Sequence, residues 1–123
     1  MLNLNSLMVG TSQPKVLAEF YEKIFGKPAD MAEGGEWYGW TVGKTFFAVG
    51  MHTQVSGSAK EPARIMFNLE TKEIKEESER IKALGAKVIK ELYEMEGMKG
   101  MWIATFADPD GNYFQLMSPW EGK

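Results

Sequence analysis

The feature that most constrains the fold is an order of elements that occurs twice: a strand, an amphipathic helix ending in glycine, and then further strands. In the first half, Leu4 to Val9 is predicted as a strand. Apolar residues between Val16 and Ile24 recur at spacings of three to four, typical of a helix with one buried face, and Gly26 ends it. Two apolar runs flank Gly43 and Lys44, which indicates a hairpin.

The second half repeats this order. Arg64 to Leu69 is predicted as a strand, and a helix with apolar residues between Ile74 and Leu84 ends at Gly85. Three more strands are predicted after it, at Lys87–Leu92, Met101–Ala107 and Tyr113–Met117. The chain is therefore predicted as an α+β protein made of a duplicated βαβββ unit, with module 1 at residues 1–52, a polar linker at 53–62 and module 2 at 63–120.

Composition narrows the possible functions. The 123 residues are 44% hydrophobic, enough for one compact domain, and their formal charge is −3 with both signs mixed. There is no basic stripe to neutralise a phosphate backbone, so nucleic acid is a poor candidate partner. The absence of cysteine excludes thiolate chemistry and cysteine-bound zinc. No membrane-spanning segment or leader is predicted, so a cytoplasmic location without membrane contact is expected.

A short motif near the end of the chain has strong turn chemistry. Asp108-Pro109-Asp110-Gly111-Asn112 lies between the last two predicted strands. Its Asp and Asn side chains are expected to satisfy local backbone groups, and Gly111 to take a positive φ angle.

Together with this turn, three further phrases form an order that resembles one known family: Ser12-Gln13-Pro14, Leu17-Ala18-Glu19-Phe20-Tyr21 and Leu84-Gly85-Ala86-Lys87-Val88. Over nearly the whole chain, the sequence is similar to the vicinal-oxygen-chelate superfamily, which contains glyoxalases, bleomycin-resistance proteins and dioxygenases. The resemblance implies two βαβββ modules that form incurved mixed sheets around a cavity, with the helices outside. It also implies a homodimer.

Enzymes of this family commonly hold a divalent metal at four strand positions, which correspond here to Ser6, Ala48, Arg64 and Gln115. A catalytic ion needs about three protein ligands, and among these residues only the amide of Gln115 is a candidate. Arg64 would repel a cation. No metal and no other cofactor are therefore predicted.

The resemblance implies that Phe114 and Leu116 face the helix, while Tyr113, Gln115 and Met117 line the cavity. The predicted ligand-binding cavity consists of Ser6, Trp40, Ala48, His52, Arg64, Trp102, Tyr113 and Gln115. Tryptophan and methionine suit a flat or apolar ligand, although each could equally fill the core. Arg64 and Gln115 are the expected polar anchors. His52, the only histidine, is a weak candidate for a catalytic base, since a lone histidine beside a linker is usually an ordinary surface residue.

Three functions remain open. The leading hypothesis is a metal-independent protein that binds a small organic molecule, as bleomycin-resistance-like relatives do. The alternative is a lyase or isomerase of the glyoxalase kind, which polarises a carbonyl and moves a proton. The third is a regulatory or structural partner domain with a vestigial cavity.

Overall fold

A computed structural model describes residues 1–119 of the chain, which forms two compact units. The first unit comprises Met1–Gly57, and the second begins at Ser58. The boundary falls inside the polar segment 53–62.

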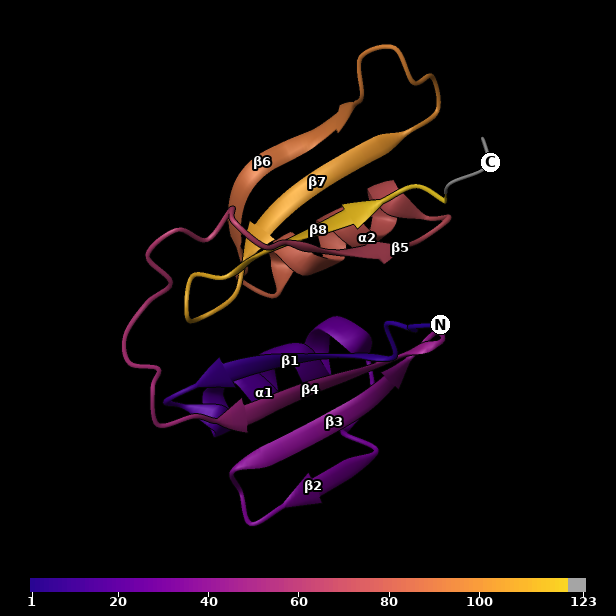
Figure 1. The fold of residues 1–123 in the computed structure, drawn as a ribbon. Helices are drawn as coiled ribbons and strands as arrows, with labels where there is room; N and C mark the ends of the chain where they lie inside the picture. Colours follow the sequence, from indigo (N-terminus) through magenta and orange to yellow (C-terminus); the bar gives the residue numbers. More distant parts are fainter. Residues whose placement is uncertain (120–123) are drawn as a thin grey trace. The chain divides into compact units, whose positions relative to one another are not determined.

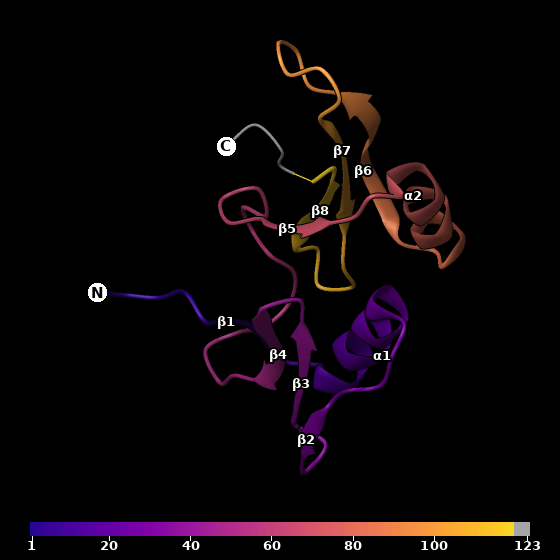
Figure 2. The ribbon, with the colours of Figure 1, turned by 90° about the vertical axis from the view of Figure 1, so that its right-hand side faces the viewer.

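The first unit is a four-stranded sheet with one helix along one of its faces (Figures 1 and 2). The strand order is β1-β4-β3-β2, and β1 pairs with β4 in parallel while the other pairs are antiparallel. The elements are β1 (Ser6–Thr11), α1 (Pro14–Phe25), β2 (Met31–Glu33), β3 (Trp37–Val42) and β4 (Thr45–Met51).

The second unit has the same architecture, with the strand order β5-β8-β7-β6 and a parallel pair between β5 and β8. Figure 1 shows α2 behind this sheet. The elements are β5 (Phe67–Glu70), α2 (Ile74–Ala83), β6 (Lys87–Glu94), β7 (Trp102–Ala107) and β8 (Tyr113–Met117). The predicted α+β class and the duplicated βαβββ unit are confirmed.

Each helix buries its apolar face against its own sheet. In the first unit, the ring of Tyr21 on α1 lies 4.8 Å from that of Phe47 on β4. Both side chains are almost wholly buried. In the second unit, Ile81 of α2 and Phe114 of β8 are buried, and Phe114 stacks on Phe106 at 5.8 Å. Burying such a side chain contributes about 1.5–3 kcal/mol, so these contacts fix which face of each sheet the helix covers.

Two local predictions need correction. The segment that starts at Arg64 was predicted as a strand, but β5 begins only at Phe67 and Arg64 lies in a turn before it. The short strand β2 was not predicted, because all three of its residues are exposed and give no burial pattern. It forms because Met31 to Glu33 pair with β3.

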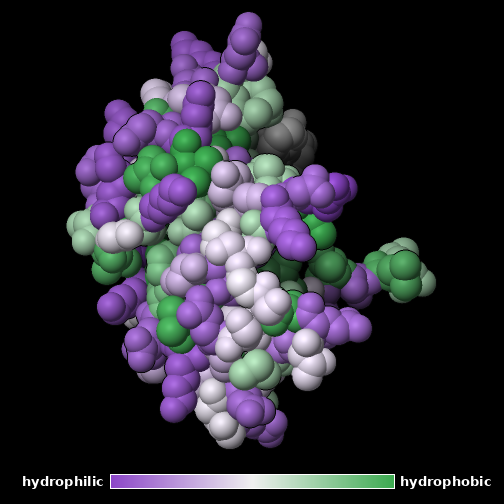
Figure 3. Space-filling view, turned by 90° about the vertical axis from the view of Figure 1, so that its left-hand side faces the viewer, coloured by the Kyte–Doolittle hydropathy of each residue, from purple (hydrophilic) through white to green (hydrophobic). Residues whose placement is uncertain are grey.

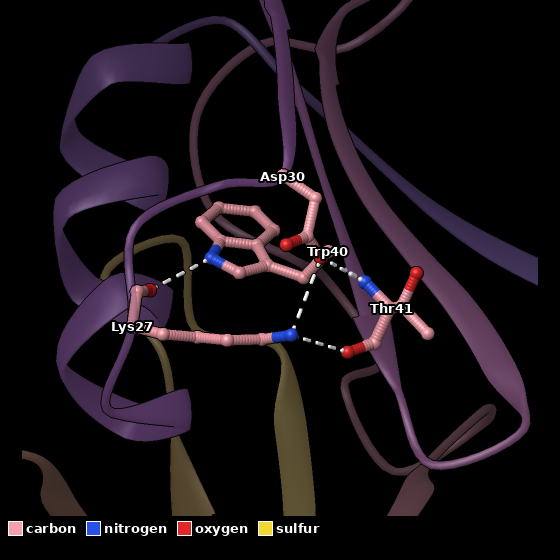
Figure 4. Close-up of polar contacts among 4 residues, drawn as sticks. All are labelled: Lys27, Asp30, Trp40 and Thr41. Carbon is pink, nitrogen blue, oxygen red and sulfur yellow. Dashed lines mark hydrogen bonds and ion pairs between the residues drawn. The ribbon is translucent and has the colours of Figure 1, made fainter.

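The connection from α1 to β2 is closed by a small polar cluster, shown in Figure 4. The indole nitrogen of Trp40 donates to the carbonyl of Lys27 at 3.0 Å. The Lys27 amine donates to the Thr41 carbonyl at 2.8 Å and to Asp30 Oδ2 at 3.3 Å. Asp30 Oδ2 also accepts the Thr41 backbone N–H at 2.6 Å. The cluster thus satisfies the polar edge of a fully buried tryptophan and ties the turn after α1 to β3.

The turn from Asp108 to Asn112 is built as its sequence predicts. Asp108 Oδ1 accepts the backbone N–H groups of Asp110 at 2.9 Å and of Asn112 at 3.0 Å. The Asn112 side-chain amide donates to Asp108 Oδ2 at 3.0 Å. Gly111 has a φ of 83°, which a side chain would disfavour. A single buried carboxylate therefore organises the whole turn.

The face in Figure 3 has a mixed surface. Figure 3 shows hydrophilic side chains spread over the viewed face, with hydrophobic ones between them. Among residues 1–119, no helix is long and apolar enough to cross a membrane.

We predict that Asp108→Ala lowers the free energy of unfolding by about 2–3 kcal/mol, because it leaves buried donors of the turn without their acceptor. Asp108→Asn retains one carbonyl oxygen and should cost less. Urea denaturation of both variants provides the measurement. Pro109→Ala, at an exposed position of the same turn, is the matched control. An Asp108→Ala protein as stable as the Pro109→Ala control would contradict this account of the turn.

A second prediction concerns pH. The Thr41 N–H bond, followed by the Lys27 ion pair, lowers the pKa of Asp30 below its ordinary value of 3.8. A lowered folded-state pKa means that this stabilisation is present above the unfolded pKa and is lost as pH falls through the folded one. The stability difference between the native protein and Asp30→Asn should therefore be constant near neutral pH and shrink below about pH 4. Chemical denaturation across this pH range measures it, and a difference that grows on acidification would refute it.

Candidate functional site

In the first sheet, the strand register defines a face turned away from α1, which we call the first open face. Phe47 and Trp40 point toward α1, so their neighbours in sequence point the other way. Ala48 of β4 pairs with Met8 of β1 and with Gly39 of β3, so these three residues share the side turned away from α1. The first open face consists of Ser6, Met8, Gly10, Trp37, Gly39, Thr41, Phe46, Ala48 and Gly50.

Two aromatic rings on the first open face contact each other and the backbone at Gly39. The rings of Trp37 and Phe46 stack with centroids 5.9 Å apart and planes inclined by 24°. A Cβ on Gly39 would overlap the Phe46 ring and lie 2.9 Å from Trp37 Cη2, closer than real Cβ contacts allow. A Cβ on Gly50 would lie 2.7 Å from Met8 Cε and 3.0 Å from Trp37 Cδ1. The glycines therefore let these side chains rest directly on the backbone.

We call Met8, Trp37 and Phe46 the aromatic platform. Trp37 and Phe46 are half-buried and Met8 is about half exposed. Partly exposed planar rings and a thioether form a surface against which a flat, apolar group can pack. The platform can bind such a group, but it supplies no acid, base or nucleophile.

His52 lies just beyond β4 on the same side. Its Cβ would be 3.2 Å from a Cβ built on Gly10, which places the histidine next to the first open face. The imidazole Nδ1 accepts the backbone N–H of Gln54 at 3.2 Å. This bond favours the neutral tautomer with the proton on Nε2. His52 is exposed, which fits an ordinary surface residue as well as a proton carrier.

The second sheet has a corresponding face, which we call the second open face because it is turned away from α2. It is polar at its centre: Gln115 on β8 is aligned with Asn68 on β5 and Thr105 on β7. The Gln115 amide nitrogen donates to the Thr105 hydroxyl at 3.0 Å. Tyr113 and Met117 lie on this face too, by alternation with the buried Phe114 and Leu116. The side-chain amides of Gln115 and Asn68 can hydrogen-bond a carbonyl or hydroxyl group of a ligand.

The structure places Trp40 and Trp102 differently from the sequence-based prediction. Trp40 has no exposed surface and packs against Phe25 of α1, 5.6 Å between ring centroids. Trp102 lies on the α2 side of its sheet, with the Lys75 amine of α2 5.7 Å from its ring centroid. Both tryptophans are expected in the cavity because they fall on predicted sheet strands, but the sequence does not show which residues of those strands the helices cover.

Arg64 also differs from its prediction. Because it precedes β5, strand alternation does not direct its side chain, which is 69% exposed. Its guanidinium donates to both carboxylate oxygens of Glu61 at 2.9 Å. This exposed ion pair lies beside a hollow of about 520 Å³ in the second unit, which Arg64 lines together with Tyr113, another of the predicted cavity residues.

The family's metal positions do not fit a divalent ion in this chain. Ala48 offers a methyl group and is 5% exposed, Ser6 offers only an exposed hydroxyl, and Arg64 is a cation. The remaining donor, Gln115, is a neutral amide already bonded to Thr105. Within the part of the chain that the structure describes, no three His, Cys, Asp or Glu side chains gather as a ligand group. No reaction step through a metal follows from these residues.

The sequence-based prediction omitted Met8, Trp37 and Phe46, the three side chains of the platform. A usable signal was present, since Gly39 and Gly50 interrupt strands otherwise rich in bulky residues. Glycine inside a strand often marks close approach of another group. Without the register, however, the sequence did not show that the rings lie on these glycines.

Comparisons with known proteins agree on the family. The profile described as "Glyoxalase-like domain" matches residues 6–117. No curated protein sequence matches the chain.

Among solved structures, the chain is similar to a glyoxalase-related enzyme from Fulvimarina pelagi, with 16% identity, a TM-score of 0.77 and coverage of 97% of this chain and 89% of the other. It is also similar to a glyoxalase/bleomycin resistance protein/dioxygenase family enzyme from Burkholderia phytofirmans PsJN, with 21% identity, a TM-score of 0.74 and coverage of 95% and 98%. A lactoylglutathione lyase from Agrobacterium tumefaciens matches with 16% identity, a TM-score of 0.73 and coverage of 94% and 92%.

At these identities the solved structures show the fold alone. The family profile, however, spans most of the chain and both repeated units. The protein belongs to the glyoxalase-like domain family, within the vicinal-oxygen-chelate superfamily of glyoxalases, bleomycin-resistance proteins and dioxygenases.

Proposed function

We propose that this protein binds a small organic molecule with a planar, apolar part, and that it does so without a resident metal. The observation that supports this most directly is the aromatic platform, in which Trp37 and Phe46 stack on each other and rest against Gly39. Stacking on a fixed ring needs no reactive group, and offset or tilted aromatic contacts contribute about 0.5–1.5 kcal/mol beyond the burial of area.

The chemistry of the surrounding residues supports binding more than catalysis. The positions where relatives hold a metal carry Ser6, Ala48, Arg64 and Gln115, which do not form a ligand set. The only histidine is exposed. Gln115 retains its carbonyl oxygen as an acceptor for a donor group on a ligand, since its bond to Thr105 uses the amide nitrogen. Cytoplasmic location and a homodimer stay predictions, and size-exclusion chromatography with light scattering tests the second.

We predict that planar aromatic antibiotics or metabolites quench tryptophan fluorescence in a saturable way, and that Trp37→Leu weakens their binding about tenfold through lost stacking. Calorimetry gives the dissociation constants. Tyr38→Leu is the matched control, because Tyr38 is also half-buried and lies on β3, but by strand alternation it points to the α1 side.

A companion variant, Gly39→Ala, keeps both aromatic side chains but displaces their rings from the sheet, since the added Cβ overlaps Phe46. It should weaken binding as well. Equal losses in Trp37→Leu and Tyr38→Leu, or no saturable binder in a broad panel, would count against the platform as the site.

The second candidate is a glyoxalase-like lyase or isomerase, favoured by the position of His52 beside the first open face. An imidazole can accept and return the proton that such an isomerisation requires. In such a lyase or isomerase, the His52 imidazole would act without a metal, as a general base that removes a proton from carbon on the ligand.

We predict no turnover of the adduct of methylglyoxal and glutathione, with or without added Ni²⁺ or Zn²⁺, and less than one tightly bound ion per chain by elemental analysis. The reason is the missing ligand set. Metal-free turnover lost in His52→Ala would establish the lyase instead. Metal-dependent turnover lost in Gln115→Ala would show that a metal binds despite the poor donors.

A further inference from the structure

A hollow of about 390 Å³ lies in the second unit, on the α2 side of the sheet and therefore apart from the second open face. Its walls come from the start of α2, from the turn before β7 and from the residues after β8. Its chemically distinctive lining residues are Lys72, Lys75, Glu76, Trp102 and Ser118. Hollows of about 300–1,000 Å³ are typical of sites for small organic molecules.

Trp102 gives this hollow an aromatic wall. Its backbone N–H donates to Ser118 Oγ at 3.0 Å, and its carbonyl accepts the Ser118 N–H at 3.0 Å. Ser118 is 9% exposed, so these bonds lie largely out of water. The indole itself is half-buried and lines the hollow. The two bonds hold the backbone of Trp102 in place, and its indole presents a plane on which a flat ligand can stack.

Two amines lie at the hollow, and that of Lys75 stands over the Trp102 ring. Lys75 Nζ lies 5.7 Å from the Trp102 ring centroid, within the range of a cation–π contact. Lys72 lines the same hollow, and both side chains are exposed. Among residues 1–119, neither amine has a carboxylate within ion-pair distance, whereas Lys27, Arg80 and Lys82 do. Glu76 is the one carboxylate of the lining, so positive charge is in excess there.

We propose that this hollow is a second binding site, which takes a small planar aromatic anion: the ring packs on Trp102 and the anionic group meets the amines of Lys72 and Lys75. A neutral aromatic compound would gain the ring contact only. A purely inorganic anion would gain only the contacts with the two amines. The hollow therefore selects for both properties in one compound, and it does so independently of the aromatic platform.

The test is an NMR titration of the full chain with 2-naphthoate, a two-ring carboxylate, and with the neutral 2-naphthamide of the same shape. We expect 2-naphthoate to shift the indole N–H signal of Trp102 and the backbone signals of Lys75 in a saturable way. The amide should bind at least about fivefold more weakly, because it lacks the charge. Absence of a saturable shift at Trp102 would overturn the proposal.

Matched variants separate this site from others. Lys75→Gln should weaken 2-naphthoate binding about threefold, and Lys72→Gln with Lys75→Gln about tenfold. Lys90→Gln is the control, since Lys90 makes a similar cation–π contact with Tyr93, at 5.2 Å, outside the hollow. All three changes are at exposed side chains, so the fold should persist, and circular dichroism checks it.

Trp37→Leu distinguishes failure here from failure of the proposed function. It should leave the shift at Trp102 unchanged, because the platform lies on the other sheet. If it abolishes that shift, or if Lys90→Gln weakens binding as much as Lys75→Gln, the second site is refuted while the platform is not.

Discussion

The structure depends on the parallel pairing of the first and last strand in each unit, β1 with β4 and β5 with β8. Two parallel neighbours require a long crossover, and a helix returning over one face of the sheet is the usual solution. Because α1 and α2 are each apolar along one stripe, each covers one face only. Strand alternation then delivers every second side chain to the face that the helix leaves uncovered, which is where a ligand site can be built.

The two units use this arrangement for different chemistry. On the first open face, Gly39 and Gly50 lack the Cβ atoms that would otherwise keep Met8, Trp37 and Phe46 away from the backbone. The second open face places Gln115 beside Thr105, where hydrogen bonds are available. The first open face can therefore bind a ligand through dispersion and aromatic stacking, and the second open face through directed hydrogen bonds. Neither carries the cluster of carboxylates and imidazoles that a divalent metal requires, within residues 1–119.

Polar groups at the turns secure the places where the chain changes direction. Asp108 gathers the donors of one turn, and Asp30 with Lys27 closes another beneath the buried indole of Trp40. In the first turn, Asp108 bonds to residues two and four positions further along the chain. In the second, Asp30 and Lys27 bond to Thr41 on the neighbouring strand β3. Such interactions depend on residue type and spacing more than on distant packing, which is why the Asp108 turn was readable in advance.

The sequence by itself determined the repeated βαβββ order, the ends of the helices at Gly26 and Gly85, the hairpin around Gly43 and the Asp108 turn, because periodicity and turn chemistry are local. It also determined that Ala48 and Gln115 are poor metal ligands, since the type of side chain alone decides how strongly it can donate to a metal. Only the tertiary structure decided which face each residue occupies. A shift of one residue in register moves a side chain to the opposite face, so Trp40 and Trp102 fell under the helices while Trp37 and Phe46 formed the platform.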